Sequence, residues 1–185
     1  AGWIGMNANA SVGSSRFGTI KGQDFNNPSL GVEFTKQTGR TTGSLTLSAS
    51  RESRADASVN LRSTSWNIPI GLSFKYPIVS AYTLSGSFGY SSRRYIDETV
   101  FSSLKTFSTS LDLYRILSNE RELITGYRYR FSESSRNTAN TDHALSLGLS
   151  GKLLRGVKGS LRAGYQTRGS TGRLASDAQS SSWFA

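Results

Sequence analysis

Residues 66–76 read Trp66-Asn67-Ile68-Pro69-Ile70-Gly71-Leu72-Ser73-Phe74-Lys75-Tyr76, and every second side chain along most of this stretch is large and apolar. A period of two places the apolar set on one face of a β-strand and the other residues on the opposite face. Residues 82–90 follow the same rule. No run of three turns has the i, i+3, i+4, i+7 spacing of an amphipathic helix. The sequence therefore predicts an all-β protein.

The alternation recurs along the whole chain and predicts about nine strands, with a partial tenth that begins near Ser180. The other strand segments are residues 4–12, 29–36, 43–50, 107–113, 122–131, 145–153 and 157–168. Short turns are expected at residues 37–40, 76–79, 116–120 and 153–156, and longer polar loops at 14–28, 51–57, 93–100, 134–142 and 169–179. Strands of about ten residues, with short turns at one end and long loops at the other, are typical of outer-membrane β-barrels. We expect an antiparallel up-and-down transmembrane barrel in the outer membrane of a Gram-negative bacterium.

The composition supports a folded envelope protein. The chain is 36% hydrophobic and 18% charged, but its 11% aromatic content exceeds that of disordered chains. No window reaches the roughly 20 apolar residues of a membrane-spanning helix. A soluble β-sandwich or lipocalin-like barrel would also alternate, yet its outer face would carry mixed Lys and Glu. Here the polar face is mainly Ser, Thr and Gly, which favours the membrane barrel.

Aromatic residues near strand ends are expected to form two belts at the membrane interfaces, where their rings meet lipid headgroups. These candidate interfacial aromatics are Trp66, Tyr76, Tyr82, Tyr90, Tyr95, Tyr127 and Tyr129. The arginines of the expected loops would face the phosphates of lipopolysaccharide, with simple surface solvation as the alternative for most of them. The loop arginines are Arg51, Arg54, Arg93, Arg94, Arg136 and Arg173.

Residues 1–185 are expected to form a single barrel domain that is truncated at its C-terminal end. The segment 61–67, which leads from a long loop into a strand, has an echo in 178–184, after which the chain ends at Ala185. A half-strand could not pair its edge inside lipid. The alternative is a short frayed tail after a closed barrel of nine or ten strands.

Residues 29–153 resemble the porin-like β-barrel proteins encoded beside bacterial exopolysaccharide and capsule export genes. The resemblance lies in Gly31-Val32-Glu33-Phe34, in Leu45-Thr46-Leu47-Ser48-Ala49-Ser50-Arg51-Glu52-Ser53, in 86–95 and in 126–131. These are pattern-level matches that unrelated outer-membrane barrels share. The resemblance implies an outer-membrane location, a transport role linked to polysaccharide, and a longer chain. A terminal strand that ends in an aromatic residue is usual in such barrels, whereas here Phe184 is followed by Ala185.

The polar face of the predicted strands is basic and is expected to line the lumen. Its acidic minority is Glu33, Asp112 and Glu122. A basic wall raises the local concentration of anions. The alternative for each basic residue is that it pairs with an acid. The candidate lumen residues are Lys75, Arg128, Arg130, Lys152, Lys158, Arg162 and Arg168.

Several other function classes have little support. With no cysteine and one histidine, His143, the chain offers no thiol chemistry, disulfide or multi-histidine metal site. It shows no nucleophile elbow or paired carboxylates, so we expect no enzyme and no cofactor. The net charge of +10 would suit nucleic acid, but aromatic and basic residues lie on opposite faces of the same strands, which argues against nucleic-acid binding.

The function expected from the sequence is a channel or export conduit with an anion-favouring lumen, linked to exopolysaccharide secretion. The alternative is a non-conducting structural barrel within a larger outer-membrane assembly. Expected partners are outer-membrane lipid and lipopolysaccharide, an anionic solute or acidic polysaccharide, and other envelope proteins.

Overall fold

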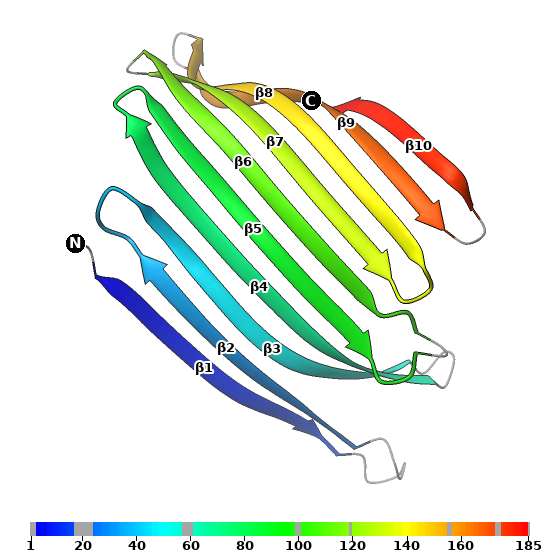
Figure 1. Ribbon diagram of the computed structural model, residues 1–185. Coiled ribbons are helices and arrows are strands. Elements are labelled where there is room, and N and C mark those ends of the chain that lie inside the picture. The colour runs from blue at the N-terminus through cyan, green and yellow to red at the C-terminus, as the bar shows by residue number, and fades with distance from the viewer. Residues whose placement is uncertain are drawn as a thin grey trace.

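The computed structural model is a single curved antiparallel sheet of ten strands, with each strand paired to its neighbours in chain order (Figure 1). It describes residues 3–16, 24–56, 61–98, 101–118, 120–154, 157–172 and 175–184, although the side chains of 54–56, 61–62, 153–154 and 175–178 are outside the description. The strands are β1 (Ile4–Ser15), β2 (Phe25–Lys36), β3 (Thr42–Asp56), β4 (Leu61–Val79), β5 (Tyr82–Tyr95), β6 (Leu104–Ser118), β7 (Arg121–Ser134), β8 (Thr138–Leu154), β9 (Val157–Gly172) and β10 (Ala175–Phe184).

This order confirms the predicted all-β, antiparallel up-and-down fold. The described strands β1 and β10 each pair with one neighbour and not with each other, so the sheet has two open edges. No helix among the described residues is long and apolar enough to cross a membrane.

The sheet has no buried apolar core among the described residues. Many large apolar side chains are instead exposed on one face, among them Leu145 at 61% and Leu161 at 67%. A soluble sandwich or barrel would bury such residues inside, so an exposed apolar face of this extent indicates a surface that meets lipid. We call this the outward face and the opposite one the polar wall.

The polar wall is the concave side of the sheet. Arg162 on β9 forms an ion pair with Asp112 on β6, past two intervening strands. With strands about 4.8 Å apart, β6 and β9 lie roughly 14 Å apart along the sheet, and curvature toward the polar wall shortens the span that one arginine must cover. The polar wall therefore faces the inside of the curve that the sheet makes.

The strands are longer than the alternation predicted. The expected loops 51–57, 134–142 and 169–179 are mostly strand, and the tenth strand begins at Ala175 rather than near Ser180. At the short-turn end, β4 continues to Val79 and β6 to Ser118. Alternation ends where both faces are polar, but the backbone ladder continues because it does not depend on side-chain polarity. Thr138, for example, pairs with both Ser134 and Gly172.

The two ends of the sheet remain different. One end, here called the loop end, has the two longest connections, residues 16–24 and 96–103, beside shorter ones at 57–60, 135–137 and 173–174. The opposite end, here called the turn end, has the connections 37–41, 80–81, 119–120 and 155–156. Outer-membrane barrels place short turns in the periplasm and longer loops outside the cell, which sets the orientation used below.

Candidate functional site on the two faces of the sheet

An oblique row of aromatic rings crosses the outward face near the loop end. Its members, one on each strand from β4 to β10, are Trp66, Tyr90, Phe107, Tyr129, His143, Tyr165 and Trp183. Three neighbouring pairs of rings are in contact distance, with centroids 5.0 Å apart for Tyr129 and His143 and also for Tyr165 and Trp183. Phe107 and Tyr129 are 6.0 Å apart.

The slope of this row matches the strand tilt of a membrane barrel. Across the paired residues, the row moves toward the turn end by about 1.3 residues per strand. At about 3.3 Å per residue and 4.8 Å between strands, this corresponds to roughly 43°, within the usual barrel tilt of about 35–45°. The row therefore runs level around the barrel, as an interfacial belt does.

The charges on the outward face define the height of the apolar band. On the described strands they lie only near the two ends: at the loop end Arg51, Arg94, Lys105 and Glu133, and at the turn end Lys36, Arg115 and Arg121. On β6 the band extends between Lys105 and Arg115. Ten residues at about 3.4 Å and a tilt near 45° give roughly 24 Å, close to the 25 Å band of outer-membrane barrels.

The predicted interfacial aromatics divide into three groups. Trp66, Tyr90 and Tyr129 belong to the aromatic row, and Tyr127 lies just below it, with its hydroxyl 2.9 Å from His143 Nδ1. Tyr76 and Tyr82 lie at the turn end, under the guanidinium groups of Arg40 and Arg115 at 4.9 and 5.7 Å.

Tyr95 departs from that prediction. It pairs with Ser65, on the polar wall, and stacks on Phe101 with ring centroids 5.1 Å apart. Its sequence position next to Arg94 gave no sign that the strand continues this far. The prediction also missed Phe107, His143, Tyr165 and Trp183, which the register of neighbouring strands could have revealed but the sequence of a single strand could not.

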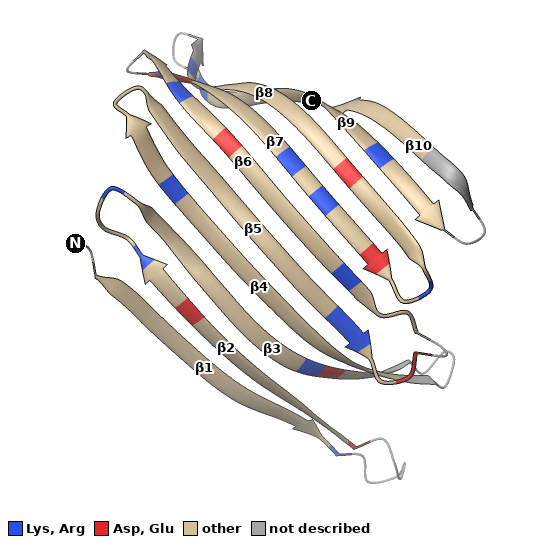
Figure 2. Cartoon of the chain, in the orientation of Figure 1, with Lys and Arg blue, Asp and Glu red and all other residues tan. Residues whose placement is uncertain are grey.

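All seven predicted lumen residues lie on the polar wall, because each is paired across the sheet with residues that face the same side. Figure 2 shows that most charged positions gather on β6 to β9. Three of the seven are held by acids: Lys152 by Glu120 at 3.0 Å, Arg162 by Asp112, and Arg168 by both carboxylate oxygens of Asp142. The other four, which form no ion pair within the described part of the chain, are Lys75, Arg128, Arg130 and Lys158.

Arg162 lies in the space left by the missing side chain of Gly126. Its Nε donates to Ser146 Oγ at 2.9 Å, and its Nη2 donates to Asp112 across Gly126. A Cβ on Gly126 would collide with both charged groups. The absence of a side chain at this position therefore lets the arginine lie flat against the sheet, where it is neutralised by Asp112.

Arg128 and Arg130 border a shallow hollow of about 270 Å³ that also involves Gln166, Phe184 and the ion pair of Arg168 with Asp142. Arg128, Ala144 and Gln166 are directly paired across β7, β8 and β9, so the small alanine forms the floor between two polar side chains. The Phe184 ring closes one side and lies over Gly164. The hollow thus combines two guanidinium groups that form no ion pair on the described wall, those of Arg128 and Arg130, with a neutralised Arg168–Asp142 pair, an amide and an aromatic face.

No protein-family model and no curated protein sequence matches the chain. Solved structures do match its fold. A loop L8 deletion mutant of OmpT, an outer membrane protein of Vibrio cholerae, has a TM-score of 0.54 and 10% identity, covering 92% of this chain and 57% of its own. In-vitro folded OmpT in its trimer form has a TM-score of 0.54 and 11% identity, with 84% and 51% covered. Outer-membrane expressed OmpT has a TM-score of 0.54 and 10% identity, with 78% and 46% covered.

The chain spans about half the length of these structures. At such low identity the likeness concerns the fold, which agrees with the exposed apolar band, the tilted aromatic row and the polar wall. The fold of this chain is that of bacterial outer-membrane β-barrel proteins.

Proposed function

We propose that the protein is an outer-membrane channel with an anion-favouring lumen. The observation that carries the proposal is the charge of the polar wall after ion pairs are removed. Lys75, Arg128, Arg130 and Lys158 remain without an acid partner on the described wall, whereas the unpaired acids are Glu33 and Glu122. Unpaired basic side chains facing a water-filled lumen attract anions and repel cations.

A wide barrel is part of this proposal. Each edge of the described sheet leaves backbone groups unpaired, which a lipid environment does not tolerate. We propose that further strands close the barrel, so that this chain is one part of a larger domain. Barrels of about 16–18 strands enclose water, whereas about eight leave an interior filled by side chains.

The solute we propose is an acidic polysaccharide in the course of secretion. The hollow at Arg128 and Arg130 supports this class, because guanidinium groups bind carboxylates and the Phe184 ring offers an apolar face of the kind that a sugar ring can cover. The resemblance to porin-like proteins of exopolysaccharide export genes agrees with the same class.

Ion selectivity in a planar bilayer tests the channel. The protein extracted from outer membranes is inserted into a bilayer with a tenfold salt gradient, and the reversal potential is measured. We expect the wild-type potential to indicate anion preference and the Arg128→Gln/Arg130→Gln variant to shift toward the cation side. The matched control, Lys36→Gln/Lys105→Gln, removes the same charge from the outward face and should leave the potential unchanged.

The refuting results are distinct. An equal reversal potential in wild type and the Arg128/Arg130 variant would mean that these basic residues do not determine the ion selectivity. Absence of any conductance in the folded, inserted protein favours the non-conducting structural barrel instead.

Polymer block tests the proposed solute. Polygalacturonate added to one side of the bilayer should reduce the wild-type conductance at lower concentration than neutral dextran of equal length, and the Arg128/Arg130 variant should lose this difference. Equal block by both polymers would refute an acidic polysaccharide as the solute.

The width of the barrel is tested by the mass of the native protein from outer membranes. A mass well above the 20.1 kDa of these residues supports additional strands. A mass of 20.1 kDa refutes them.

A further inference from the structure

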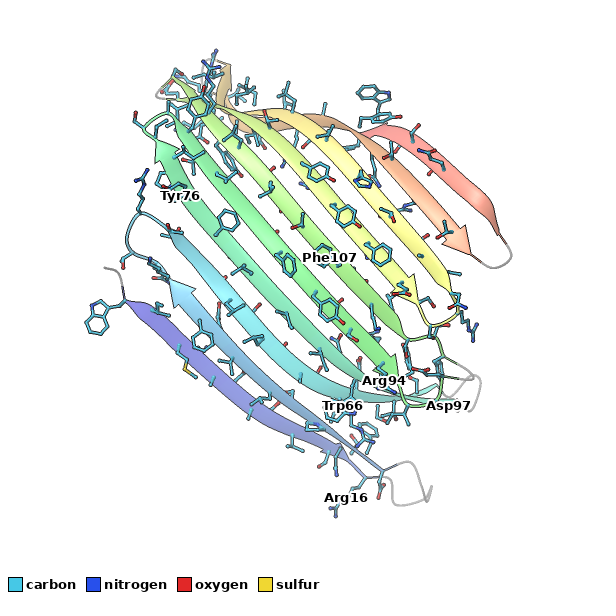
Figure 3. All side chains as sticks on the ribbon, in the orientation of Figure 1. Arg16, Trp66, Tyr76, Arg94, Asp97 and Phe107 are labelled. Atoms are coloured by element: carbon cyan, nitrogen blue, oxygen red, sulfur yellow. The ribbon has the colours of Figure 1, made fainter. Side chains whose placement is uncertain are left out.

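A second basic group lies on the outward face at the loop end, away from the polar wall. Arg51 on β3, Trp66 on β4 and Arg94 on β5 are paired across the sheet, so the two arginines flank the indole. Trp66 is the first member of the aromatic row that marks the membrane interface. Figure 3 shows Trp66 and Arg94 together at the loop end, with Asp97 nearby.

Arg51 lacks the partner that its position demands. Its Nε is buried and has no hydrogen-bond acceptor, and its guanidinium group has no ion pair within the described residues. A buried donor without an acceptor costs free energy, and a bound ion, water or ligand is one way in which such a group is satisfied. Arg94 has a side chain that is 82% exposed and only a loose contact of 3.9 Å with Glu98.

Arg51 also borders a hollow of about 670 Å³ at the loop end, lined by residues at the end of β1, the start of β2 and residues 96–97, with one residue each from β3 and β4. Arg16, Asn26 and Thr64 line it with further donors. Two acids, Asp24 and Asp97, line it as well, and each takes part in an interaction of its own. Two arginines and two acids therefore line the hollow, while Arg94 lies outside its lining and contacts Glu98.

We propose that Arg51, Trp66 and Arg94 bind a phosphate of lipid A in the outer leaflet. The level of the aromatic row places this group at headgroup depth, and the long connections at this end place it in the outer leaflet. A phosphate supplies the charged acceptor that Arg51 lacks, and arginine forks bind phosphate oxygens in pairs. Acyl chains would lie along the apolar band below. This proposed site depends on how the barrel lies in the membrane, and it does not depend on whether the barrel conducts ions.

Lipid titration followed by native mass spectrometry tests this site. The protein in mild detergent is titrated with bis-phosphorylated lipid A and, separately, with dephosphorylated lipid A of the same acyl pattern, at fixed ionic strength. We expect wild type to prefer the phosphorylated lipid and Arg51→Gln/Arg94→Gln to bind it about thirtyfold more weakly. Binding of the dephosphorylated lipid should not change.

The control variant is Arg115→Gln/Arg121→Gln, which removes two outward charges at the turn end and should bind lipid A like wild type. Since Arg51 is half-buried, Arg94→Gln alone gives a second measurement, with about a fivefold loss expected, and gel mobility before and after heating verifies that each variant is folded.

Three results overturn the proposal: equal binding of the two lipids by wild type, an unchanged preference in the Arg51/Arg94 variant, or an equal loss in the control. Millimolar inorganic phosphate should leave the lipid preference intact, and its abolition would assign the site to free phosphate instead. Reversal potentials are expected to be unchanged in the Arg51/Arg94 variant, which separates this site from the channel.

Discussion

Substitution of Gly126 by alanine tests whether Arg162 lies flat against the polar wall and pairs with Asp112. The added Cβ would collide with Arg162 Nη2 and Asp112 Oδ1, and would lie 2.9 Å from Ser146 Oγ. Because the obstruction includes both ends of the ion pair, Arg162 must leave Asp112. The variant therefore breaks a charged interaction without altering either charged residue.

The magnitude follows from the exposure of the pair. The side chains of Arg162 and Asp112 are 27% and 18% exposed, so the interaction is screened less than a surface ion pair but more than a buried one. Hydrogen bonds to charged groups contribute about 1.5–3 kcal/mol, and we take about 2 kcal/mol here. Alanine in a strand is favoured over glycine by about 0.5–1 kcal/mol. The free energy of unfolding should fall by about 1–1.5 kcal/mol.

Urea unfolding of the protein in phospholipid vesicles, followed by tryptophan fluorescence, measures this change. The control is Gly169→Ala on β9, where a Cβ meets nothing within 4 Å and stability should rise slightly. The Gly126 substitution is repeated in an Asp112→Ala background, where its cost should disappear. A coupling energy below about 0.5 kcal/mol between the two positions would refute the arrangement.

Three further predictions concern the outward face and the turn end, each measured by the same unfolding assay. Leu111→Arg, in the middle of the apolar band, should lower the free energy of unfolding by about 2–4 kcal/mol, whereas Glu133→Arg at the loop end should change it by at most about 1 kcal/mol; equal costs would contradict the placement of the band. Tyr127→Phe removes the hydrogen bond to His143 and should cost about 0.5–1.5 kcal/mol, and no loss would mean that the bond is absent in lipid. Arg40→Gln removes two hydrogen bonds to carbonyl oxygens near the end of β4 and should cost about 1–2 kcal/mol, with an unchanged midpoint contradicting that role.

The sequence predicted the strands because lipid on one side and water on the other impose a strict alternation. Residues 66–76 carry this pattern, and they lie in one strand of the structure. The same pattern could not locate strand ends, because beyond the membrane both faces of a strand are polar. Thr138 and Asn140 were therefore expected in a loop, although their backbones pair on both sides.

The sequence also predicted which basic residues share the polar wall, since parity within a strand decides the face. It could not predict which of them are neutralised. Arg162 and Asp112 lie fifty residues apart, and their contact depends on Gly126 and Ser146 in the two strands between them. Such a contact depends on the register and curvature of four strands together, and the sequence of a single strand reveals neither of them.

The slope of the aromatic row has a consequence for what the protein could let through. At a tilt near 43° and a spacing of about 4.8 Å, each strand occupies roughly 6.6 Å of circumference, so every added hairpin widens the barrel by about 13 Å in circumference and about 2 Å in radius. Ten strands closed on themselves would give a backbone radius of roughly 10 Å, and sixteen would give roughly 17 Å. In the proposed channel, the count of hairpins would therefore set in steps the size of the largest molecule that passes, and the residues of the wall would decide which molecules of that size are preferred.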